Sequence, residues 1–271
     1  MSYLFFDIDG TLVSHEIGLI PSAKEAIEKT QGLGHKVFIA TGRHLGSLSV
    51  VADLKVDGIL YCNGAGIQLD GKIIQTFPIP HDICSKTVFQ AEERGGSYTL
   101  LSTKEMFLNI AQMDEFKKRA LSENQWIKSM ELFGAYPWTS YRNQDILKID
   151  LGFSSEEIMM DFLGQMDDQL MLASTAGYHI DEGNKSGEIT LKGINKGTAI
   201  QWLIQYLGAS MEDTYGFGDS NNDLEMLKLC HVGVAMGNAF DSAKEIADWI
   251  TKPIQEDGIA YALDHFGLIQ D

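Results

Sequence analysis

Short runs of apolar residues, each followed by glycine or a polar residue, recur along the chain. The first occupies residues 3–6, and four others lie at 37–40, 58–62, 214–218 and 231–235. A continuous apolar run that ends in a turn is typical of a strand buried on both faces of a parallel sheet. Segments with helical spacing of apolar residues separate these runs, at 21–33, 195–207, 224–229 and 258–266, and a further helix is expected to end at Leu54. This alternation predicts an α/β fold, a doubly wound parallel sheet of the Rossmann type with right-handed crossovers.

The pattern changes between residues 81 and 186. A hairpin signal, Asp70-Gly71 between two apolar segments, precedes this region, and Pro78 and Pro80 follow the hairpin. Within the region we predict helices at 82–94 and 154–167, the second capped by Ser154, and strands at 97–101, 147–152, 169–174 and 178–181. We therefore predict a core domain of residues 1–80 and 187–271, in which a short strand at 189–191 opens the second part, and an inserted α+β domain of residues 81–186.

Composition and charge restrict the class of partner. The 271 residues carry a net charge of −17, which argues against binding to nucleic acid or an anionic membrane. Cys62, Cys84 and Cys230 are too widely separated for a disulfide framework or a zinc cluster. We find no export signal and no apolar run long enough to span a bilayer, so a cytoplasmic location is expected.

Two aspartates directly follow the first apolar run. Asp7 and Asp9 are followed by Gly10, so both side chains can reach the crevice beyond the carboxyl end of the strand, where open α/β sheets place their ligands. Two carboxylates so close repel each other; a divalent cation relieves this repulsion and leaves one oxygen free to act as a nucleophile. The same residues also fit a turn with two solvated acids. A calcium loop is excluded, because Thr11 and Ser14 do not supply its ligands.

Polar side chains follow other predicted strands or begin helices at the same edge of the sheet. They are Thr41, Lys196, Asp219, Asn222 and Asp223. Lys196 lies in the first turn of its helix, where a cation opposes the macrodipole by about 0.3–1 kcal/mol, and a nearby carboxylate or bound anion would offset this cost. Each residue alone also fits an ordinary turn, cap or surface role. Together they indicate a site for an anionic ligand.

Four segments match, in order, the motifs of a known superfamily: DIDGTL at 7–12, ATGR at 40–43, NKGTA at 195–199 and GDSNND at 218–223. The chain resembles the haloacid dehalogenase-like (HAD) superfamily. The order of the motifs and the insertion after the third strand are similar to its Cof-type, subclass IIB sugar-phosphate phosphatases, whose inserted domain is a C2B cap. The resemblance covers the whole core, whereas the inserted domain matches mainly in length and α+β character.

The resemblance implies hydrolysis of a phosphate ester through an aspartyl-phosphate. Asp7 would be the nucleophile, and Asp9 would protonate the leaving oxygen and then activate water. Mg²⁺ would be bound by Asp7, the main-chain carbonyl of Asp9 and Asp219. The remaining roles fall to Thr41, Gly42, Arg43, Lys196 and Asn222 as contacts to the phosphate or substrate, and to Asp223, which would orient Lys196 or a metal-bound water.

The expected partner is a small phosphorylated metabolite, and the sequence does not predict the oligomeric state. Asp9 favours a phosphatase, because the superfamily's dehalogenases lack this pair of acids and its transport ATPases carry threonine at that position. Two alternatives stay open: a sugar phosphomutase, and a non-catalytic module that binds a phosphorylated metabolite. Within the inserted domain, Arg142 and His179 are candidate specificity residues, although ordinary surface roles are favoured for both.

Overall fold

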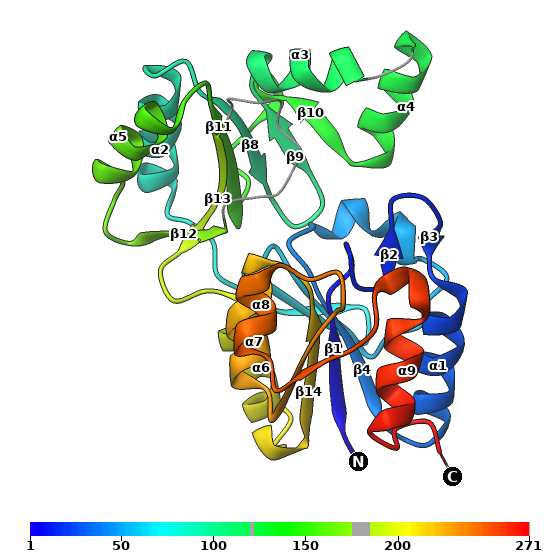
Figure 1. Cartoon of the computed structure of the whole chain (residues 1–271). Helices are drawn as coiled ribbons and strands as arrows, with labels where there is room; N and C mark the ends of the chain where they lie inside the picture. The colour runs from blue at the N-terminus through cyan, green and yellow to red at the C-terminus, as the bar shows by residue number, and fades with distance from the viewer. Residues whose placement is uncertain (120–121, 175–184, 271) are drawn as a thin grey trace. The chain divides into compact units, whose positions relative to one another are not determined.

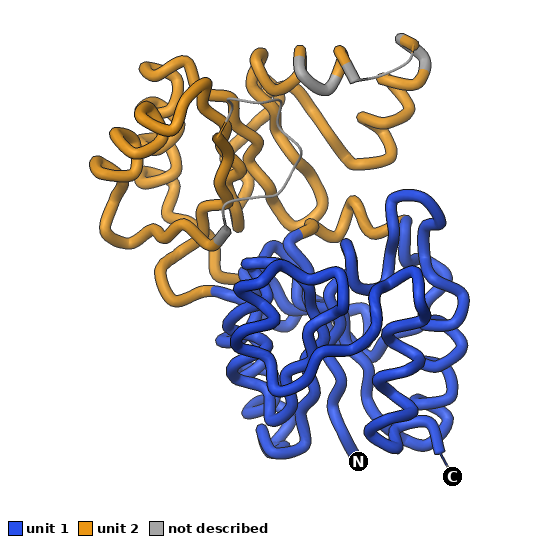
Figure 2. Tube along the Cα trace, in the orientation of Figure 1, with its two compact units in different colours: residues 1–42, 50–75, 195–271 blue, residues 43–49, 76–194 orange. Residues whose placement is uncertain are grey.

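A computed structural model of the chain describes residues 1–119, 122–174 and 185–270. The chain divides into two compact units (Figure 2). The core unit comprises Met1–Gly42, Val50–Gln75 and Asn195–Asp271, and the inserted unit comprises Arg43–Ser49 and Thr76–Ile194. No helix within the described ranges is long and apolar enough to cross a membrane.

An eight-stranded sheet forms the centre of the core unit, in the order β16-β15-β14-β1-β4-β5-β6-β7. The strands are β1 (Tyr3–Phe6), β4 (Lys36–Ala40), β5 (Gly58–Tyr61), β6 (Gly66–Leu69), β7 (Lys72–Thr76), β14 (Thr214–Gly218), β15 (Val232–Ala235) and β16 (Trp249–Ile250). All pairs from β16 to β5 are parallel, whereas β6 runs antiparallel to β5 and turns into β7 at Asp70-Gly71. The predicted parallel sheet and the hairpin are therefore both present. A separate two-stranded sheet joins β2 (Val13–Ser14) to β3 (Gly18–Leu19).

Helices cover both faces of this sheet, with α1 and α9 on one side and α6, α7 and α8 on the other (Figure 1). The helices are α1 (Pro21–Gly32), α6 (Lys196–Tyr206), α7 (Leu224–Leu229), α8 (Asp241–Ile246) and α9 (Gly258–His265), with short 3₁₀ turns at Met211–Asp213, Asn221–Asp223 and Ile254–Glu256. Because both faces are covered, β1 is buried along its whole length. Phe5 stacks on Phe38 at 5.0 Å between ring centroids, and Phe6 stacks on Phe217 at 4.5 Å. This double burial explains the unbroken apolar run in the sequence.

The order of the strands reverses between β1 and β14. From β1 the chain proceeds to β4 and β5 on one side, whereas β14, β15 and β16 extend the sheet on the other. Open α/β sheets bind their ligands at such a switch point, beyond the carboxyl ends of the strands. Asp7 follows β1 and Asp219 follows β14, so the topology brings these two aspartates to the same place.

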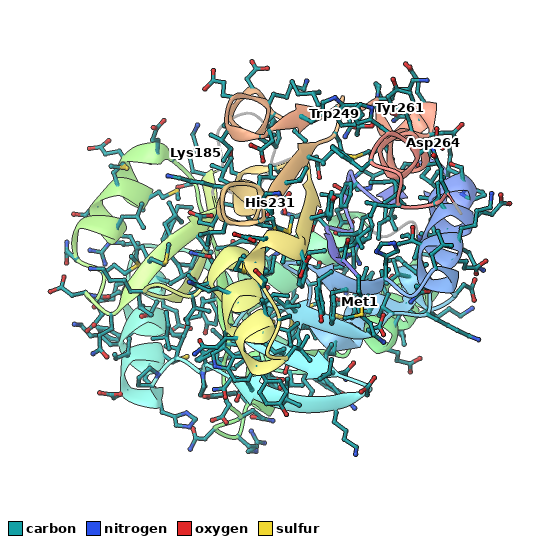
Figure 3. All side chains as sticks on the ribbon, turned by 90° about the horizontal axis from the view of Figure 1, so that it is seen from below. Met1, Lys185, His231, Trp249, Tyr261 and Asp264 are labelled. Carbon is teal, nitrogen blue, oxygen red and sulfur yellow. The ribbon has the colours of Figure 1, made fainter. Side chains whose placement is uncertain are left out.

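Aromatic residues pack β16, at the edge of the core sheet, against α9. Trp249 stacks on His265 with 4.4 Å between ring centroids and on Tyr261 with 5.8 Å, and Figure 3 shows Trp249 beside Tyr261. Lys252 places its ammonium 4.3 Å from the centroid of the Tyr261 ring. This edge strand is only two residues long, which limits pairing with other chains.

The inserted unit contains a six-stranded sheet in the order β10-β9-β8-β11-β13-β12, with α2 and α5 on one face (Figure 1). Its elements are α2 (His81–Glu92), β8 (Ser97–Leu101), β9 (Met106–Leu108), α3 (Ile110–Arg119), α4 (Glu123–Leu132), β10 (Ala135–Pro137), β11 (Lys148–Phe153), α5 (Glu156–Gly164), β12 (Leu170–Ser174) and β13 (Lys185–Leu191), with a 3₁₀ helix at Trp138–Ser140. A further 3₁₀ helix, Leu45–Val51, begins in this unit and ends in the core unit. Ile149, Phe153 and Phe162 belong to the buried apolar cluster of the inserted unit. The unit is therefore an α+β domain with its own core.

The expected domain boundary at residue 187 falls inside β13. Ile189 pairs with Ile149 of β11, and Thr190 pairs with Met171 of β12, so the whole strand belongs to the inserted sheet. The core unit resumes at Asn195. The partner of β12 is thus β13; the strand predicted at 178–181, with His179, lies outside the described residues.

Two local predictions are wrong. Ser155, not Ser154, caps α5, because its side chain accepts a hydrogen bond from the Ile158 N–H. The segment expected to form a helix ending at Leu54 is a 3₁₀ helix, Leu45–Val51, with a non-helical residue at Ser47.

Residues 43–49 are held by the inserted unit through their own hydrogen bonds. The Leu45 N–H donates to the Thr103 carbonyl at 2.9 Å, and the His44 Nε2 lies 2.9 Å from the Phe133 carbonyl. Burial lowers the pKa of His44 to about 4, so the imidazole is neutral near pH 7 and donates through Nε2. These contacts join the residues that follow the Ala40–Arg43 motif to the inserted unit.

Candidate active site

Asp7 is held at the end of β1 in a nearly solvent-free position. Its side chain is 6% exposed, and its backbone N–H donates to the Phe217 carbonyl of β14 at 2.9 Å. The chain then turns at Gly10, whose φ of +84° favours glycine. Any Cβ at position 10 would lie 2.2 Å from Asp219 Oδ2, so glycine also leaves the space for that carboxylate.

Lys196 enters the same site from the first turn of α6. Asn195 is the N-cap of this helix: its side chain accepts from the Thr198 N–H at 2.9 Å, and Thr198 Oγ1 accepts from the Asn195 N–H at 3.1 Å. The Lys196 side chain is fully buried, and its Nζ lies 2.6 Å from Asp7 Oδ1 and 2.6 Å from Asp223 Oδ1. Burial acts to lower the pKa of Lys196, but attraction to Asp223 and Asp7 outweighs it and raises the pKa. Two carboxylates thus compensate a cation at a helix N-terminus.

The loop after β14 supplies three further side chains. Asp223 is completely buried; its Oδ2 accepts from the backbone N–H groups of Asp219 and Ser220, each at 3.0 Å. Asn222 Oδ1 accepts from Ser220 Oγ at 2.7 Å and lies 3.4 Å from Lys196 Nζ. Because Asp223 is fixed by backbone amides, it holds the Lys196 ammonium rigidly beside Asp7.

The carboxylates of Asp7, Asp219 and Asp223 offer oxygens that lie within 4.8 Å of one another. Burial raises the pKa of Asp7, and the neighbouring carboxylates add to the rise while Lys196 opposes it. Burial, with repulsion from Asp223, also raises the pKa of Asp219 to about 7. Such a cluster is unfavourable when fully ionised, and a divalent cation would relieve the repulsion.

The donor set suits a hard cation such as Mg²⁺, which prefers carboxylate and carbonyl oxygens. Both oxygens of Asp223 already accept hydrogen bonds from Lys196 and backbone amides, which leaves Asp7 and Asp219 as the better side-chain ligands. Asp219 Oδ1 also accepts from Thr11 Oγ1 at 3.1 Å. The charge of Asp9 is close enough to raise the pKa of both Asp7 and Asp219.

Thr41 and Gly42 follow β4, the strand beside β1. Thr41 is fully buried; its N–H donates to the Leu60 carbonyl at 2.8 Å, and its carbonyl accepts from the Asn63 N–H at 2.9 Å. Arg43 belongs to the inserted unit, where its Nη1 donates to the Ser47 carbonyl at 3.1 Å. Hydrogen bonds therefore connect Asp7, Lys196, Asn222 and Asp223 directly, whereas Thr41 lies at the neighbouring strand end.

Sequence reasoning missed two residues that support the site, Thr11 and Asn238; it named Asn63 as a residue at a core strand end that could contact the inserted domain or the substrate or form a turn. Thr11 binds Asp219, and Asn63 accepts from Asn222 Nδ2 at 3.1 Å. Asn238 donates from Nδ2 to the Gly10 carbonyl at 2.9 Å and so holds the turn after Asp7. Thr11 lies inside the first motif and Asn63 lies directly after the apolar run 58–62, and these positions were the available signal.

Comparison with known proteins agrees with this geometry. The family model of haloacid dehalogenase-like hydrolases matches residues 4–263. YkrA of Bacillus subtilis (strain 168) is 30% identical over 98% of both chains, and the 5-amino-6-(5-phospho-D-ribitylamino)uracil phosphatase YcsE of the same organism is 28% identical over 97% of this chain and 94% of its own.

Solved structures of other proteins have a fold similar to that of this chain. The HAD subclass IIB sugar phosphatase BT4131 has a TM-score of 0.80 and 28% identity, covering 99% of this chain and 100% of its own. The HAD phosphatase BT1666 from Bacteroides thetaiotaomicron also has a TM-score of 0.80, with 26% identity over 99% and 96% of the two chains. The chain therefore belongs to the haloacid dehalogenase-like hydrolases and is a phosphatase of this superfamily.

Proposed function

We propose that the protein is a Mg²⁺-dependent phosphatase that hydrolyses small phosphorylated metabolites, sugar phosphates in the first place, through an aspartyl-phosphate on Asp7. One observation carries the proposal: a buried carboxylate, Asp7, lies 2.6 Å from a buried ammonium, Lys196, at the switch point of the sheet. A nucleophile and a cation that neutralises phosphate charge are the two groups this reaction needs most. The sugar phosphatase BT4131 supports the substrate class.

In the first step, an oxygen of Asp7 attacks phosphorus and forms a new P–O bond. The bond from phosphorus to the bridging ester oxygen breaks, and Asp9 gives its proton to that oxygen, so that the alcohol leaves uncharged. The phosphoryl group stays on Asp7 as a mixed anhydride.

In the second step, water attacks the same phosphorus. Asp9, now a carboxylate, takes a proton from the water, and the bond from phosphorus to the Asp7 oxygen breaks. Inorganic phosphate leaves and the Asp7 carboxylate is restored. The sum of the two steps is ester plus water giving alcohol plus phosphate.

The other residues of the site neutralise negative charge or position the phosphate. Lys196 neutralises the negative charge of the phosphoryl oxygens, and Asp223 fixes the position of the Lys196 ammonium by an ion pair. The Thr41 hydroxyl, the Gly42 amide, Arg43 and Asn222 are the remaining contacts to the phosphate or substrate in this proposal. Positioning and electrostatic stabilisation supply most of the rate in phosphoryl transfer.

Asp7, Asp219 and the main-chain carbonyl of Asp9 would hold Mg²⁺. The ion would supply positive charge that favours the ionised form of Asp7 and offsets negative charge on the transferred group. Without that charge, burial keeps the pKa of Asp7 raised.

We also propose that the enzyme acts in the cytoplasm on free metabolites. Cys62, Cys84 and Cys230 are buried free thiols, which suits a reducing compartment. The net charge of −17 disfavours nucleic acids and anionic membranes as partners.

The test compares the wild type with Asp7→Asn in the release of phosphate from a generic aryl phosphate, and then from hexose, pentose and nucleoside phosphates. Asp7→Asn removes the nucleophile while preserving shape, so turnover should fall to the blank while the melting temperature shows an intact fold. Asp53→Asn changes an exposed acid of the core unit and should leave turnover unchanged. Retained turnover in Asp7→Asn would remove Asp7 from its role.

Two further assays on the purified wild type distinguish the two alternative functions. A phosphomutase would isomerise a sugar phosphate when a sugar bisphosphate is supplied as activator. A non-catalytic module would bind hexose phosphate and release no phosphate in the presence of Mg²⁺. The acid–base carboxylate Asp9 argues against the second alternative, because a binding module does not need it.

A further inference from the structure

The turn after β5 has an unusual backbone at a buried place. Cys62, Asn63 and Gly64 have φ angles of +50°, +55° and +88°, in the left-handed region that disfavours most side chains. Cys62 and Asn63 are adjacent non-glycine residues there, and both are almost completely buried. Left-handed residues persist where the surrounding contacts define them, and they concentrate at functional sites.

This turn contacts three segments of the active site at once. The Asn63 N–H donates to the Thr41 carbonyl at 2.9 Å. The Asn63 Oδ1 accepts from Asn222 Nδ2 at 3.1 Å. A Cβ at Gly64 would lie 2.5 Å from the carbonyl oxygen of Asn195, the N-cap of the helix that begins with Lys196. This turn, which lies outside the four motifs, therefore contacts the segments that carry three of them, and Asn63 itself hydrogen-bonds two of these segments.

Both ends of the Asn222 carboxamide are held. Its oxygen accepts from Ser220 Oγ and faces the Lys196 ammonium, and its nitrogen donates to Asn63. With the carboxamide fixed in this way, the side chain of Asn222 keeps one orientation beside Lys196. Loss of the Asn63 acceptor would free the carboxamide to rotate, and a bound phosphate would have to restore its orientation.

We propose that Asn63 is a positioning residue for phosphate binding: from a left-handed turn, it orients the Asn222 carboxamide and holds the end of the strand that carries Thr41. The inference rests on the proposed function, because Asn222 and Thr41 are its phosphate ligands. Asparagine suits the position, since it tolerates the left-handed conformation and offers a short acceptor.

The test is a double-mutant cycle on the binding of inorganic phosphate in the presence of Mg²⁺, measured by isothermal titration calorimetry. The four proteins are the wild type, Asn63→Gly, Asn222→Ala and the double variant. Glycine accepts the φ of +55° and keeps the backbone N–H that donates to Thr41, so the variant removes the side-chain acceptor and preserves this backbone hydrogen bond. Asp70→Gly is the matched control, because Asp70 is an exposed left-handed residue of the same unit.

Asn63→Gly should weaken phosphate binding about three- to tenfold, the effect of one hydrogen bond, and Asp70→Gly should not change it. In the Asn222→Ala background the Asn63→Gly change should have no further effect, because its partner is gone. For an aryl phosphate substrate, KM should rise more than kcat falls. Full additivity of the two changes, or unchanged binding by Asn63→Gly, would overturn the inference.

The readout separates this inference from the proposed function. A wild type that binds phosphate but hydrolyses no ester would refute the proposed function. The double-mutant cycle on phosphate binding would still test whether Asn63 positions Asn222. A wild type that binds no phosphate would overturn the inference. If Asn63→Gly does not fold, proton exchange of the Asn222 Nδ2 group in the wild type decides: protection relative to the exposed Asn143 supports the inference, and equal exchange overturns it.

Discussion

Lys196 Nζ lies 2.6 Å from Asp223 Oδ1, and neither side chain has any exposed surface. Asp223 itself accepts hydrogen bonds from the backbone amides of Asp219 and Ser220. These bonds restrict the carboxylate that contacts the ammonium. Asp7 lies on the other side of the ammonium. The site therefore contains one fully buried cation between two carboxylates, of which only Asp7 is slightly exposed.

Replacement of Lys196 by methionine should abolish phosphatase activity and destabilise the protein. Methionine keeps the volume but leaves Asp7 and Asp223 buried without their cation, which should lower the free energy of unfolding by about 3–5 kcal/mol. Urea denaturation without Mg²⁺ measures this change. Lys192→Met, at an exposed position four residues earlier, should leave both quantities unchanged. A Lys196→Met protein as stable as the wild type would show that the carboxylates are not ionised.

Gly218→Ala should displace Asp223. A Cβ at position 218 would lie 2.5 Å from Asp223 Cγ and 2.6 Å from its Cβ, so the carboxylate would have to move away from Lys196. We expect a loss of about 1–3 kcal/mol in the free energy of unfolding, as for other overpacked sites, together with a fall in kcat. Gly32→Ala is the control, because nothing lies within 4 Å of a Cβ there. Normal kcat in Gly218→Ala would mean that Asp223 does not hold Lys196 during turnover.

Stabilisation by Mg²⁺ should depend on pH through Asp219. Its pKa is raised from 3.8 to about 7, so the metal-free folded protein binds a proton more tightly than the unfolded chain does. This group therefore favours folding at low pH, and its contribution is lost as the pH rises from 3.8 through about 7. Mg²⁺ needs the ionised carboxylate, so it should raise the melting temperature more at about pH 8 than at about pH 5.

Asp219→Asn should remove most of that pH-dependent gain, whereas Asp53→Asn, at an exposed acid, should retain it. Melting curves with and without Mg²⁺ at the two pH values give the comparison. An equal gain from Mg²⁺ in the wild type and in Asp219→Asn would place the ion elsewhere.

Much of the core unit could be predicted because its signals are local. Each buried strand is an apolar run such as 3–6 or 214–218, and the rules of parallel sheets bring the residues after β1 and β14 to one edge. Asn195 has the form of an N-cap, so the start of α6 and the place of Lys196 were also predictable.

Features set by distant partners could not be predicted. The sequence of β13 is compatible with a short strand of either unit. Only its pairing with β11 and β12 assigns it to the inserted sheet. The role of Asn63 depends on a backbone angle and on Asn222, 159 positions away. The segment after Arg43 contains Gly46 and Ser47, which weaken an α-helix, and hydrogen bonds that it donates to the carbonyls of Thr103 and Phe133 determine its course.

The inserted unit is discontinuous in sequence, and this affects how such domains can be exchanged between relatives. A transplant of residues 76–194 alone would leave behind the segment 43–49, and with it the partners of Thr103 and Phe133. Any chimera that exchanges this unit therefore has to carry both pieces. The same constraint applies to His44, because a substitution there would leave the Phe133 carbonyl, more than eighty positions further along the chain, without this hydrogen bond.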